Sequence, residues 1–204
     1  VGGDYFDFIR MNENKLAVCL GDVSGKGLPA AMLMANLQAT LRGQTLLANS
    51  PKQCIERSNK LLLESTSDEK YATLFYGILD TATHQLSYTN AGHNPPMILS
   101  KDGSMRLLRT GGIMIAMIDN FPFEEETVSF LPGDTLIIYS DGITEAINEK
   151  EDEFGEARLG DLLKKIVNKP PEEMITSVIE AVNAHAGNMP QADDMTMVIL
   201  KMGE

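Results

Sequence analysis

Cysteine is scarce in this sequence, and its two cysteines do not form the pattern of a disulfide framework. Cys19 and Cys54 both lie in apolar segments, where a free thiol usually serves as a small buried side chain. Secreted domains that depend on disulfides have a much higher density of cysteine. We therefore expect two buried, reduced thiols in a cytoplasmic protein.

Long apolar runs and a leader sequence are also missing. No stretch approaches the roughly 18 consecutive apolar residues that indicate a membrane span, and the first residues lack the pattern of a signal peptide. We therefore expect no association with a membrane. The sequence opens on Val1-Gly2-Gly3-Asp4 rather than on methionine, so we expect a domain cut from a longer protein.

Basic residues are few compared with acidic ones. The 17 lysines and arginines against 29 aspartates and glutamates give a net charge of −12, which argues against nucleic acid or anionic lipid as a partner. The excess of acid has two interpretations: it keeps the protein soluble, or bound cations neutralise some of the carboxylates. With 43% hydrophobic residues among 204, the composition is that of one globular domain.

Strand-like and helix-like patterns alternate along the chain. Short or alternating apolar runs predict strands over residues 4–10, 15–21, 71–80, 85–91, 96–100, 105–109, 123–130, 135–140 and 195–201. Helical periodicity predicts helices over residues 28–48 and 50–65, and two more around residues 159–166 and 174–182. Ser50 and Gln53 predict a capping box at the second helix. The acid-rich stretch 148–156 is expected to be an exposed loop.

Mostly antiparallel strands, with helices clustered in pairs, indicate an α+β protein. Two sheets packed face to face, with helices outside them in four α-β-β-α layers, would bury the apolar stripes. The helix over residues 28–48 has apolar residues on nearly every side, so we expect it to be buried between layers. We expect residues 1–204 to form a single domain.

Four aspartates stand where an apolar strand meets a turn: Asp4, Asp22, Asp141 and Asp193. Inside a strand such a carboxylate would be costly to bury, whereas at a strand end it can face a shared cleft. Several carboxylates in one cleft repel one another, and Mg²⁺ or Mn²⁺, which prefer oxygen ligands, would remove the conflict. Gly-Asp and Asp-Gly pairs are also ordinary turns, so spacing alone leaves both interpretations open.

Six segments, taken in order, resemble a known family. They are residues 1–7 (VGGDYFD), 21–27 (GDVSGKG), 71–77 (YATLFYG), 90–96 (NAGHNPP), 139–146 (YSDGITEA) and 193–196 (DDMT). In this order they resemble the SpoIIE/RsbU-type branch of the metal-dependent protein phosphatases, which are related to protein phosphatase 2C. The resemblance covers almost the whole chain.

The resemblance implies a β-sandwich flanked by helices, two Mn²⁺ or Mg²⁺ ions, and hydrolysis of phosphoserine or phosphothreonine. A water activated by the metals would attack phosphorus without a covalent enzyme intermediate. Matched residue by residue, the family's metal ligands, which also carry catalysis, are Asp4, Asp22, the backbone carbonyl of Val23, Asp141 and Asp193. The candidates for supporting these ligands are Asp7, Asp194 and Gly142.

The sequence also departs from the family's pattern. Ser24 stands where eukaryotic relatives have a histidine that is a candidate acid for the leaving group, so water or another group must supply that proton. Residues 111–117 replace a proline-containing, glycine-rich turn, which leaves the shape of that loop open. The strand and helix that precede the first motif in relatives would lie outside this chain.

A few residues carry weaker signals. Lys26 lies among glycines before a helix, but its segment does not fit the spacing of a P-loop; a place near the incoming phosphate stays open. His93, in a turn-forming segment, is interpreted as a hydrogen-bonded structural histidine rather than a catalytic one. Thr144 and Glu145 either support Asp141 or cap the short helix expected after it.

The function that follows is that of a cytoplasmic protein serine/threonine phosphatase in bacterial partner switching, a form of signal transduction. By resemblance, the substrate would be a phosphorylated anti-sigma-factor antagonist, and a regulatory domain before this chain would control activity. Two alternatives stay open. One is a degenerate, non-catalytic binding module; the other is a two-metal phosphoesterase that acts on nucleotides or other small phosphoesters.

Overall fold

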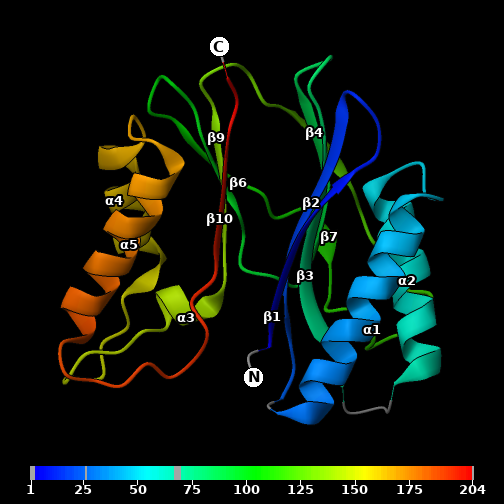
Figure 1. Ribbon diagram of the computed structural model, residues 1–204, viewed down its shortest axis with the longest axis horizontal. Helices are drawn as coiled ribbons and strands as arrows, with labels where there is room; N and C mark the ends of the chain where they lie inside the picture. The colour runs from blue at the N-terminus through cyan, green and yellow to red at the C-terminus, as the bar shows by residue number, and fades with distance from the viewer. Residues whose placement is uncertain (1–2, 26, 67–69, 204) are drawn as a thin grey trace. The chain divides into compact units, whose positions relative to one another are not determined.

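A computed structural model describes residues 3–25, 27–66 and 70–203 of the chain (Figure 1). The chain divides into two compact units, each made of two separate segments. The first unit comprises Val1–Pro95 and Leu108–Leu131, and the second comprises Pro96–Leu107 and Pro132–Glu204. Each unit contains one sheet and its own helices, so the predicted α+β class is confirmed.

The first unit has a six-stranded sheet, in the order β1-β2-β3-β4-β7 with β8 also paired to β4. Its strands are β1 (Asp4–Arg10), β2 (Lys15–Val23), β3 (Ala72–Asp80), β4 (Gln85–Ala91), β7 (Gly111–Gly112) and β8 (Glu126–Ser129). The predicted β1–β2 hairpin is confirmed: the Asn12 side chain accepts hydrogen bonds from the amides of Asn14 and Lys15. Among the described strands of this sheet, only β7 runs parallel to its neighbour. The sequence did not predict β7 because two glycines carry no strand signal.

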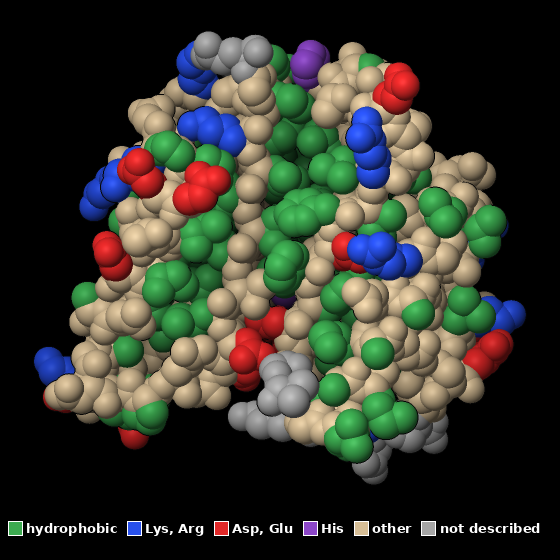
Figure 2. Space-filling view, in the orientation of Figure 1, with side chains coloured by type: hydrophobic (Ala, Val, Ile, Leu, Met, Phe, Trp, Pro, Cys, Tyr) green, Lys and Arg blue, Asp and Glu red, His purple; other side chains and the backbone are tan. Residues whose placement is uncertain are grey.

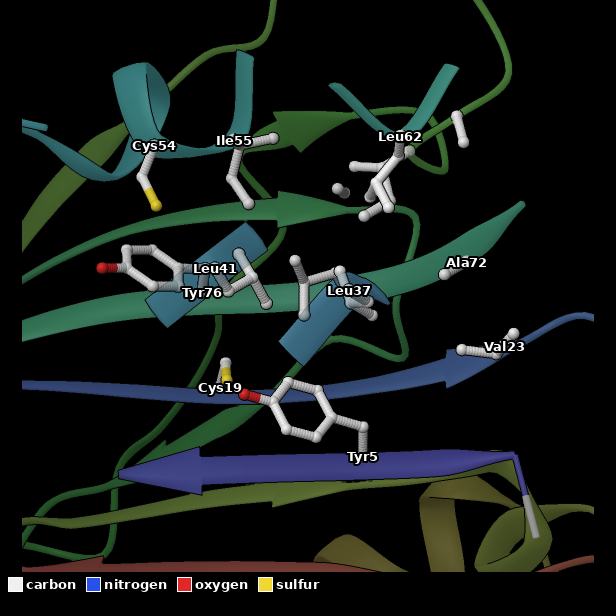
Figure 3. Close-up of a cluster of buried hydrophobic side chains, with 14 of the residues drawn as sticks. Tyr5, Cys19, Val23, Leu37, Leu41, Cys54, Ile55, Leu62, Ala72 and Tyr76 are labelled. Carbon is white, nitrogen blue, oxygen red and sulfur yellow. The ribbon is translucent and has the colours of Figure 1, made fainter. Parts of the chain in front are cut away.

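Helices α1 (Leu28–Thr45) and α2 (Pro51–Ser65) cover one face of this sheet. Alternate residues of the strands point toward them, as expected for a period of two. Figure 3 shows the resulting core, in which Tyr5, Cys19 and Tyr76 from the strands meet Leu37 and Leu41 from α1. Both cysteines are free and buried, as predicted.

The expectation that α1 is buried between layers was wrong. Leu33, Leu37 and Leu41 form a buried stripe, but Leu28 and Met32 are 73% and 66% exposed. The helix therefore buries one face only. Its apolar residues suggested burial all round because composition does not reveal which side a sheet covers.

The start of α2 shows one half of the predicted capping box. The Ser50 hydroxyl accepts a hydrogen bond from the Gln53 amide at 3.4 Å, as an N-cap residue does. The Gln53 side chain reaches back to the amide of Asn49 at 2.9 Å, one residue before the position that the motif predicts. Both contacts fix the first turn of the helix against the preceding loop.

The loop over residues 111–117, whose shape the sequence left open, is held by the sheet and by α2. Ile115 forms an antiparallel bridge with Ala72. The Asn59 side chain from α2 accepts from the Ala116 amide at 2.8 Å and donates to the Ile118 carbonyl at 2.9 Å. Since Asn59 is buried, these bonds fix the loop firmly to the first unit.

The second unit has a four-stranded sheet in the order β10-β9-β5-β6. Its elements are β5 (Met97–Leu99), β6 (Met105–Leu107), β9 (Thr135–Tyr139), α3 (Asp141–Thr144), α4 (Gly155–Ile166), α5 (Pro171–Ala186) and β10 (Met197–Lys201). Ile137 and Tyr139 pack in one core with Leu163 of α4 and Val178 of α5. We had expected the whole stretch 148–156 to be an exposed loop. Its last residues are helical instead, because α4 already begins at Gly155.

The surface agrees with the charge pattern of the sequence. On the face of the described residues that Figure 2 shows, lysine and arginine side chains are scattered and interspersed with acidic ones. Such a distribution lacks the basic stripe that phosphate backbones require. Within the described ranges, no helix combines the length and apolar character needed to cross a membrane.

The one-sided burial of α1 can be tested with two substitutions. Replacing Leu37, which is fully buried, with alanine should lower the free energy of unfolding by about 2–5 kcal/mol because a cavity is left in the core. Met32→Ala on the exposed side of the same helix should change it by less than about 0.5 kcal/mol. Urea denaturation of both variants gives the values, and equal losses would show that α1 is buried on both sides.

Candidate metal centre

The first pair of predicted ligands lies at one end of the six-stranded sheet. Asp4 of β1 stands directly opposite Asp22 of β2. The Val23 amide donates to the Gly3 carbonyl, so the next pair along, Asp4 and Asp22, is a non-hydrogen-bonded pair, in which side chains stand closest. Both carboxylates point away from the face that α1 and α2 cover, because their chain neighbours, Tyr5 after Asp4 and Val23 after Asp22, belong to that face.

Gly3 lets the Asp22 carboxylate and a backbone carbonyl come together. A Cβ atom at Gly3 would lie 2.7 Å from Asp22 Oδ1 and 3.0 Å from the Val23 carbonyl oxygen. Both oxygens therefore converge on the space that a side chain at this position would fill. This is the arrangement expected if the Val23 carbonyl joins Asp22 as a ligand.

The second pair belongs to the second unit. Asp141 begins α3 directly after β9, and Asp193 lies in the loop before β10. Burial, followed by the negative charge of Asp193, raises the pKa of Asp141, although backbone amides oppose the shift. The two carboxylates are thus close enough to repel each other, and neither is paired with a lysine or arginine in the ion pairs of the described residues.

Ser140 and Gly142 hold the Asp193 loop beside Asp141. The buried Ser140 hydroxyl donates to the Asp194 carbonyl at 3.1 Å and accepts from the Thr196 amide at 2.9 Å. A Cβ atom at Gly142 would lie 2.1 Å from the Asp194 carbonyl oxygen, so the two backbones touch. The predicted supporting residue Gly142 therefore acts by letting this loop pack closely.

The four carboxylates thus stand as two pairs, one in each unit. Across residues 3–25, 27–66 and 70–203, no three or more His, Cys, Asp or Glu side chains gather closely enough to hold a metal ion as one group. Each pair offers oxygen donors of like charge, and the first adds a carbonyl oxygen. This donor chemistry fits hard divalent cations such as Mg²⁺ and Mn²⁺.

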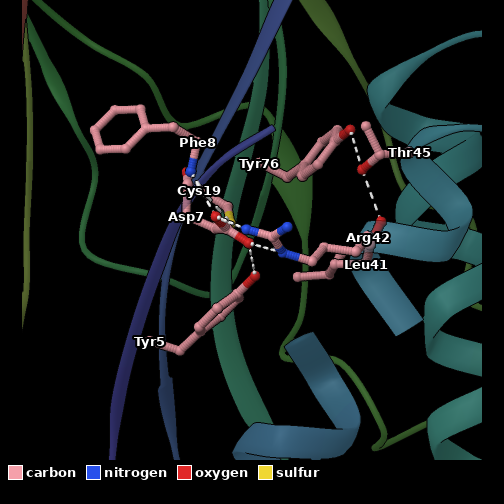
Figure 4. Close-up of polar contacts among 8 residues, drawn as sticks. All are labelled: Tyr5, Asp7, Phe8, Cys19, Leu41, Arg42, Thr45 and Tyr76. Atoms are coloured by element: carbon pink, nitrogen blue, oxygen red, sulfur yellow. Dashed lines mark hydrogen bonds and ion pairs between the residues drawn. The ribbon is translucent and has the colours of Figure 1, made fainter. Parts of the chain in front are cut away.

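Asp7 is not brought next to Asp4. It points to the opposite face of β1, where the Arg42 guanidinium of α1 donates to both of its carboxylate oxygens, at 2.7 and 2.8 Å (Figure 4). The Tyr5 hydroxyl also donates to it at 2.8 Å. Burial acts to raise the pKa of Asp7, but the hydrogen bonds from Arg42, Tyr5 and the Phe8 amide outweigh it and lower the pKa. These contacts stabilise the packing of α1 on the sheet.

The other predicted supporting groups use their backbones or form local bonds. Asp194 contributes its carbonyl to the clamp of Ser140, while its amide donates to Asp193 Oδ1 at 2.8 Å. The Thr144 hydroxyl donates to the Asp141 carbonyl at 3.3 Å, a local bond within α3. The hydroxyl of Ser24 accepts from the Tyr71 amide at 3.1 Å, so it is engaged in joining β2 to β3. Lys26, like Val1 and Gly2 of the first motif, lies outside the described residues.

Thr73 was assigned no role from the sequence, although it lies in the motif at residues 71–77. Thr73 of β3 stands opposite Asp22, so Asp4, Asp22 and Thr73 form one row across three strands. The Thr73 hydroxyl is 2.9 Å from Nδ1 of His93, which agrees with the interpretation of His93 as a hydrogen-bonded residue. Counting the register from Asp22 across the β2–β3 pair would have identified Thr73.

A cavity of about 140 Å³ adjoins Asp193 and Gly142 in the second unit. Its walls are mainly apolar and include Ile147, Val182 and Ala186. Sites for drug-sized ligands are about 300–1,000 Å³, whereas a cavity of about 150 Å³ holds a single benzene. This cavity therefore has room for one side chain.

Comparisons with known proteins identify the family of this chain. Residues 12–203 match the family described as stage II sporulation protein E (SpoIIE). The chain is 29% identical to Protein IcfG of Synechocystis sp., over 97% of this chain and 35% of that protein. It is 25% identical to phosphoserine phosphatase RsbU of Bacillus subtilis, over 98% of this chain and 59% of RsbU.

A solved structure supports the fold. The crystallised PP2C phosphatase domain of SpoIIE from Bacillus subtilis, with a fragment of its regulatory domain, superposes with a TM-score of 0.85 at 25% identity, covering 99% of this chain and 59% of that one. This similarity confirms the expected protein phosphatase 2C-like fold class. The chain spans about a third to three fifths of the length of the two curated relatives.

The Asp7–Arg42 contact should make stability depend on pH in acid. Since the pKa of Asp7 is lowered in the folded protein, its contribution is complete above the unfolded value of about 3.9 and is lost as the pH falls through the folded value. Asp7→Asn should therefore lower the free energy of unfolding by about 1–3 kcal/mol at neutral pH, and the difference from wild type should narrow as the pH falls below about 3.9 and through the folded pKa.

Urea denaturation at about pH 7, 5 and 3 measures this difference. Glu13→Gln, in the exposed β1–β2 turn, is the matched control and should leave stability unchanged at every pH. A difference between wild type and Asp7→Asn that stayed constant down to the lowest pH would contradict the stabilising role of the ionised carboxylate.

The close packing at Gly142 gives a second prediction. Gly142→Ala forces the Asp194 backbone away and should lower the free energy of unfolding by about 1–3 kcal/mol. Gly160→Ala, within α4, meets only the end of the Met105 side chain at 3.4 Å and should be neutral or stabilising by up to about 1 kcal/mol. Denaturation curves of both variants measure these changes in the free energy of unfolding. An unchanged free energy of unfolding for Gly142→Ala would mean that the loop does not pack as described.

Proposed function

Because this chain belongs to the SpoIIE family, we propose that it is a metal-dependent protein serine/threonine phosphatase. The proposal rests on four carboxylates that stand in two pairs next to strands. Beside each pair a glycine lets the backbone come near. Paired carboxylates are unfavourable without a cation. Strand pairing and the buried Ser140 hydroxyl fix these two pairs in place, so the fold is suited to binding metal ions.

The proposed ligands are those that the family resemblance implies: Asp4, Asp22 and the carbonyl of Val23, with Asp141 and Asp193. Two divalent ions, Mn²⁺ or Mg²⁺, fit these oxygen donors. When bound, such ions lower the pKa of water and balance the charge of the phosphoryl oxygens. The carboxylates themselves are acceptors only, so their part is to hold and orient.

We do not propose Ser24 as the group that donates a proton to the leaving oxygen of the substrate. The Ser24 hydroxyl accepts from the Tyr71 amide, and its own amide donates to the Tyr71 carbonyl at 2.9 Å. These bonds fix Ser24 as part of the β2–β3 connection. The proposed donor is water or another group.

The proposed substrate is a protein that carries phosphoserine or phosphothreonine, and within bacterial partner switching an anti-sigma-factor antagonist. The similarity to RsbU, whose name describes a phosphoserine phosphatase, supports this. The small cavity beside Asp193 has room for a side chain of such a protein. We further propose a regulatory domain N-terminal to this chain, and a cytoplasmic location, in which the two buried thiols stay reduced.

Activity can be tested with a phosphoserine peptide in the presence of Mn²⁺. Wild type should hydrolyse it, and EDTA should abolish the reaction. Asp141→Ala should lower kcat/KM by more than about 100-fold, since even groups one step removed from a metal are worth about 10–100-fold. Glu180→Ala, an exposed acid on α5, is the control and should retain full activity.

The two alternatives give different results in the same assay. Failure to hydrolyse either the peptide or a generic aryl phosphate, with Mn²⁺ at about pH 7–9, would favour a binding module. Faster hydrolysis of nucleotides than of phosphopeptides would favour the small-phosphoester enzyme. Full activity of Asp141→Ala would overturn the ligand assignment itself.

A further inference from the structure

Thr73 is placed to hold the strand end that carries Asp22. The two residues are direct neighbours in the β2–β3 ladder. In addition to this pairing, the Asp22 amide donates to the Thr73 hydroxyl at 3.3 Å. Thr73 thus contacts the backbone of a proposed metal ligand from the strand on the side opposite Asp4.

The Thr73 hydroxyl is in turn held by His93, which follows β4. Nδ1 of His93 lies 2.9 Å from the hydroxyl. His93 is only 5% exposed, and its backbone is fixed by Asn90: the His93 amide donates to the Asn90 side chain at 2.8 Å, and that side chain donates back to the His93 carbonyl at 3.0 Å. A third bond from Asn90 to the Leu108 carbonyl, at 3.2 Å, anchors the turn.

The Thr73 hydroxyl has one proton to donate and two lone pairs that accept. One lone pair accepts the amide proton of Asp22. The bond to Nδ1 of His93 therefore has two arrangements: the hydroxyl donates to an unprotonated Nδ1, or it accepts from a protonated one. The tautomer of His93 distinguishes them, and in both arrangements the two side chains hold each other in place.

We propose that Thr73 and His93 are positioning residues for Asp22. His93 orients the Thr73 hydroxyl, and the hydroxyl fixes the amide of Asp22. The backbone that carries the Asp22 carboxylate is therefore held in place. The effect on metal binding rests on the proposed function, because only there is Asp22 a ligand. Groups that orient metal ligands in this way are worth about 10–100-fold in metal affinity.

The hydrogen-bond chain can be tested without metal by NMR of the 204-residue protein. Thr73→Val keeps the shape of the side chain but removes the hydroxyl. It should speed hydrogen exchange at the Asp22 amide by about 10-fold, and it should move the ¹⁵N shift of His93 Nδ1 because that nitrogen loses its partner. Unchanged exchange at Asp22, or an Nδ1 shift that does not respond to Thr73→Val, would overturn the chain.

The positioning role is tested by Mn²⁺ affinity, measured by calorimetry. Thr73→Val and His93→Leu should each raise the Kd by about 10-fold. Thr73→Ser, which keeps the hydroxyl, and His93→Asn, which keeps an acceptor, should stay within about 2-fold of wild type. The double variant Thr73→Val/His93→Leu should lose no more than either single one, since both act through one chain.

His84→Asn is the matched control. His84 has a positive φ of 53° in the β3–β4 turn, a conformation that asparagine adopts readily, so this variant should bind Mn²⁺ as wild type does. Equal losses in Thr73→Ser and Thr73→Val, or additive losses in the double variant, would overturn the proposal. Absence of Mn²⁺ binding by wild type would instead refute the proposed metal centre, while the NMR result would still decide the hydrogen-bond chain.

Discussion

Repulsion between neighbouring carboxylates is the constraint on which the candidate site depends. Asp4 faces Asp22 across two paired strands, and burial together with the charge of Asp193 raises the pKa of Asp141. On free loops, such side chains would swing apart into water. Here strand pairing fixes the first pair, and the Ser140 hydroxyl fixes the loop of the second. The unfavourable charge is thus retained in the folded protein, where a cation can neutralise it.

Close approach of the backbone is what makes each pair compact. Gly3 leaves room for Asp22 Oδ1, and Gly142 leaves room for the Asp194 carbonyl. At both positions a methyl group would occupy the space that polar oxygens now use. The glycines in the two motifs therefore serve the same physical purpose, although one lies beside a strand and the other in the first turn of a short helix.

Periodic patterns and strand-end chemistry allowed much of the fold to be predicted from the sequence. The β1–β2 hairpin, the two helix pairs and the final strand follow from local rules that act over a few residues. The one-sided burial of α1 was missed, because the exposed Leu28 and Met32 look like core residues until the sheet beside them is known. Strand β7 was missed because its two glycines are placed by pairing with β4 rather than by any preference of their own.

The candidate site, like the fold, could be predicted from the sequence only in part. The family resemblance implied Asp4 as a ligand and Asp7 as a candidate for supporting it, but a period of two puts them on opposite faces of β1. Register alone therefore separates a residue that pairs with Asp22 from one that binds Arg42. The helix-covered face of the sheet carries apolar residues and the Asp7–Arg42 contact, which stabilise the fold. The other face carries Asp4, Asp22 and Thr73 in one row at the end of the sheet, and farther along it carries buried apolar side chains such as Leu20 and Phe75. One rigid sheet therefore places oxygen donors at the end of a packed apolar face.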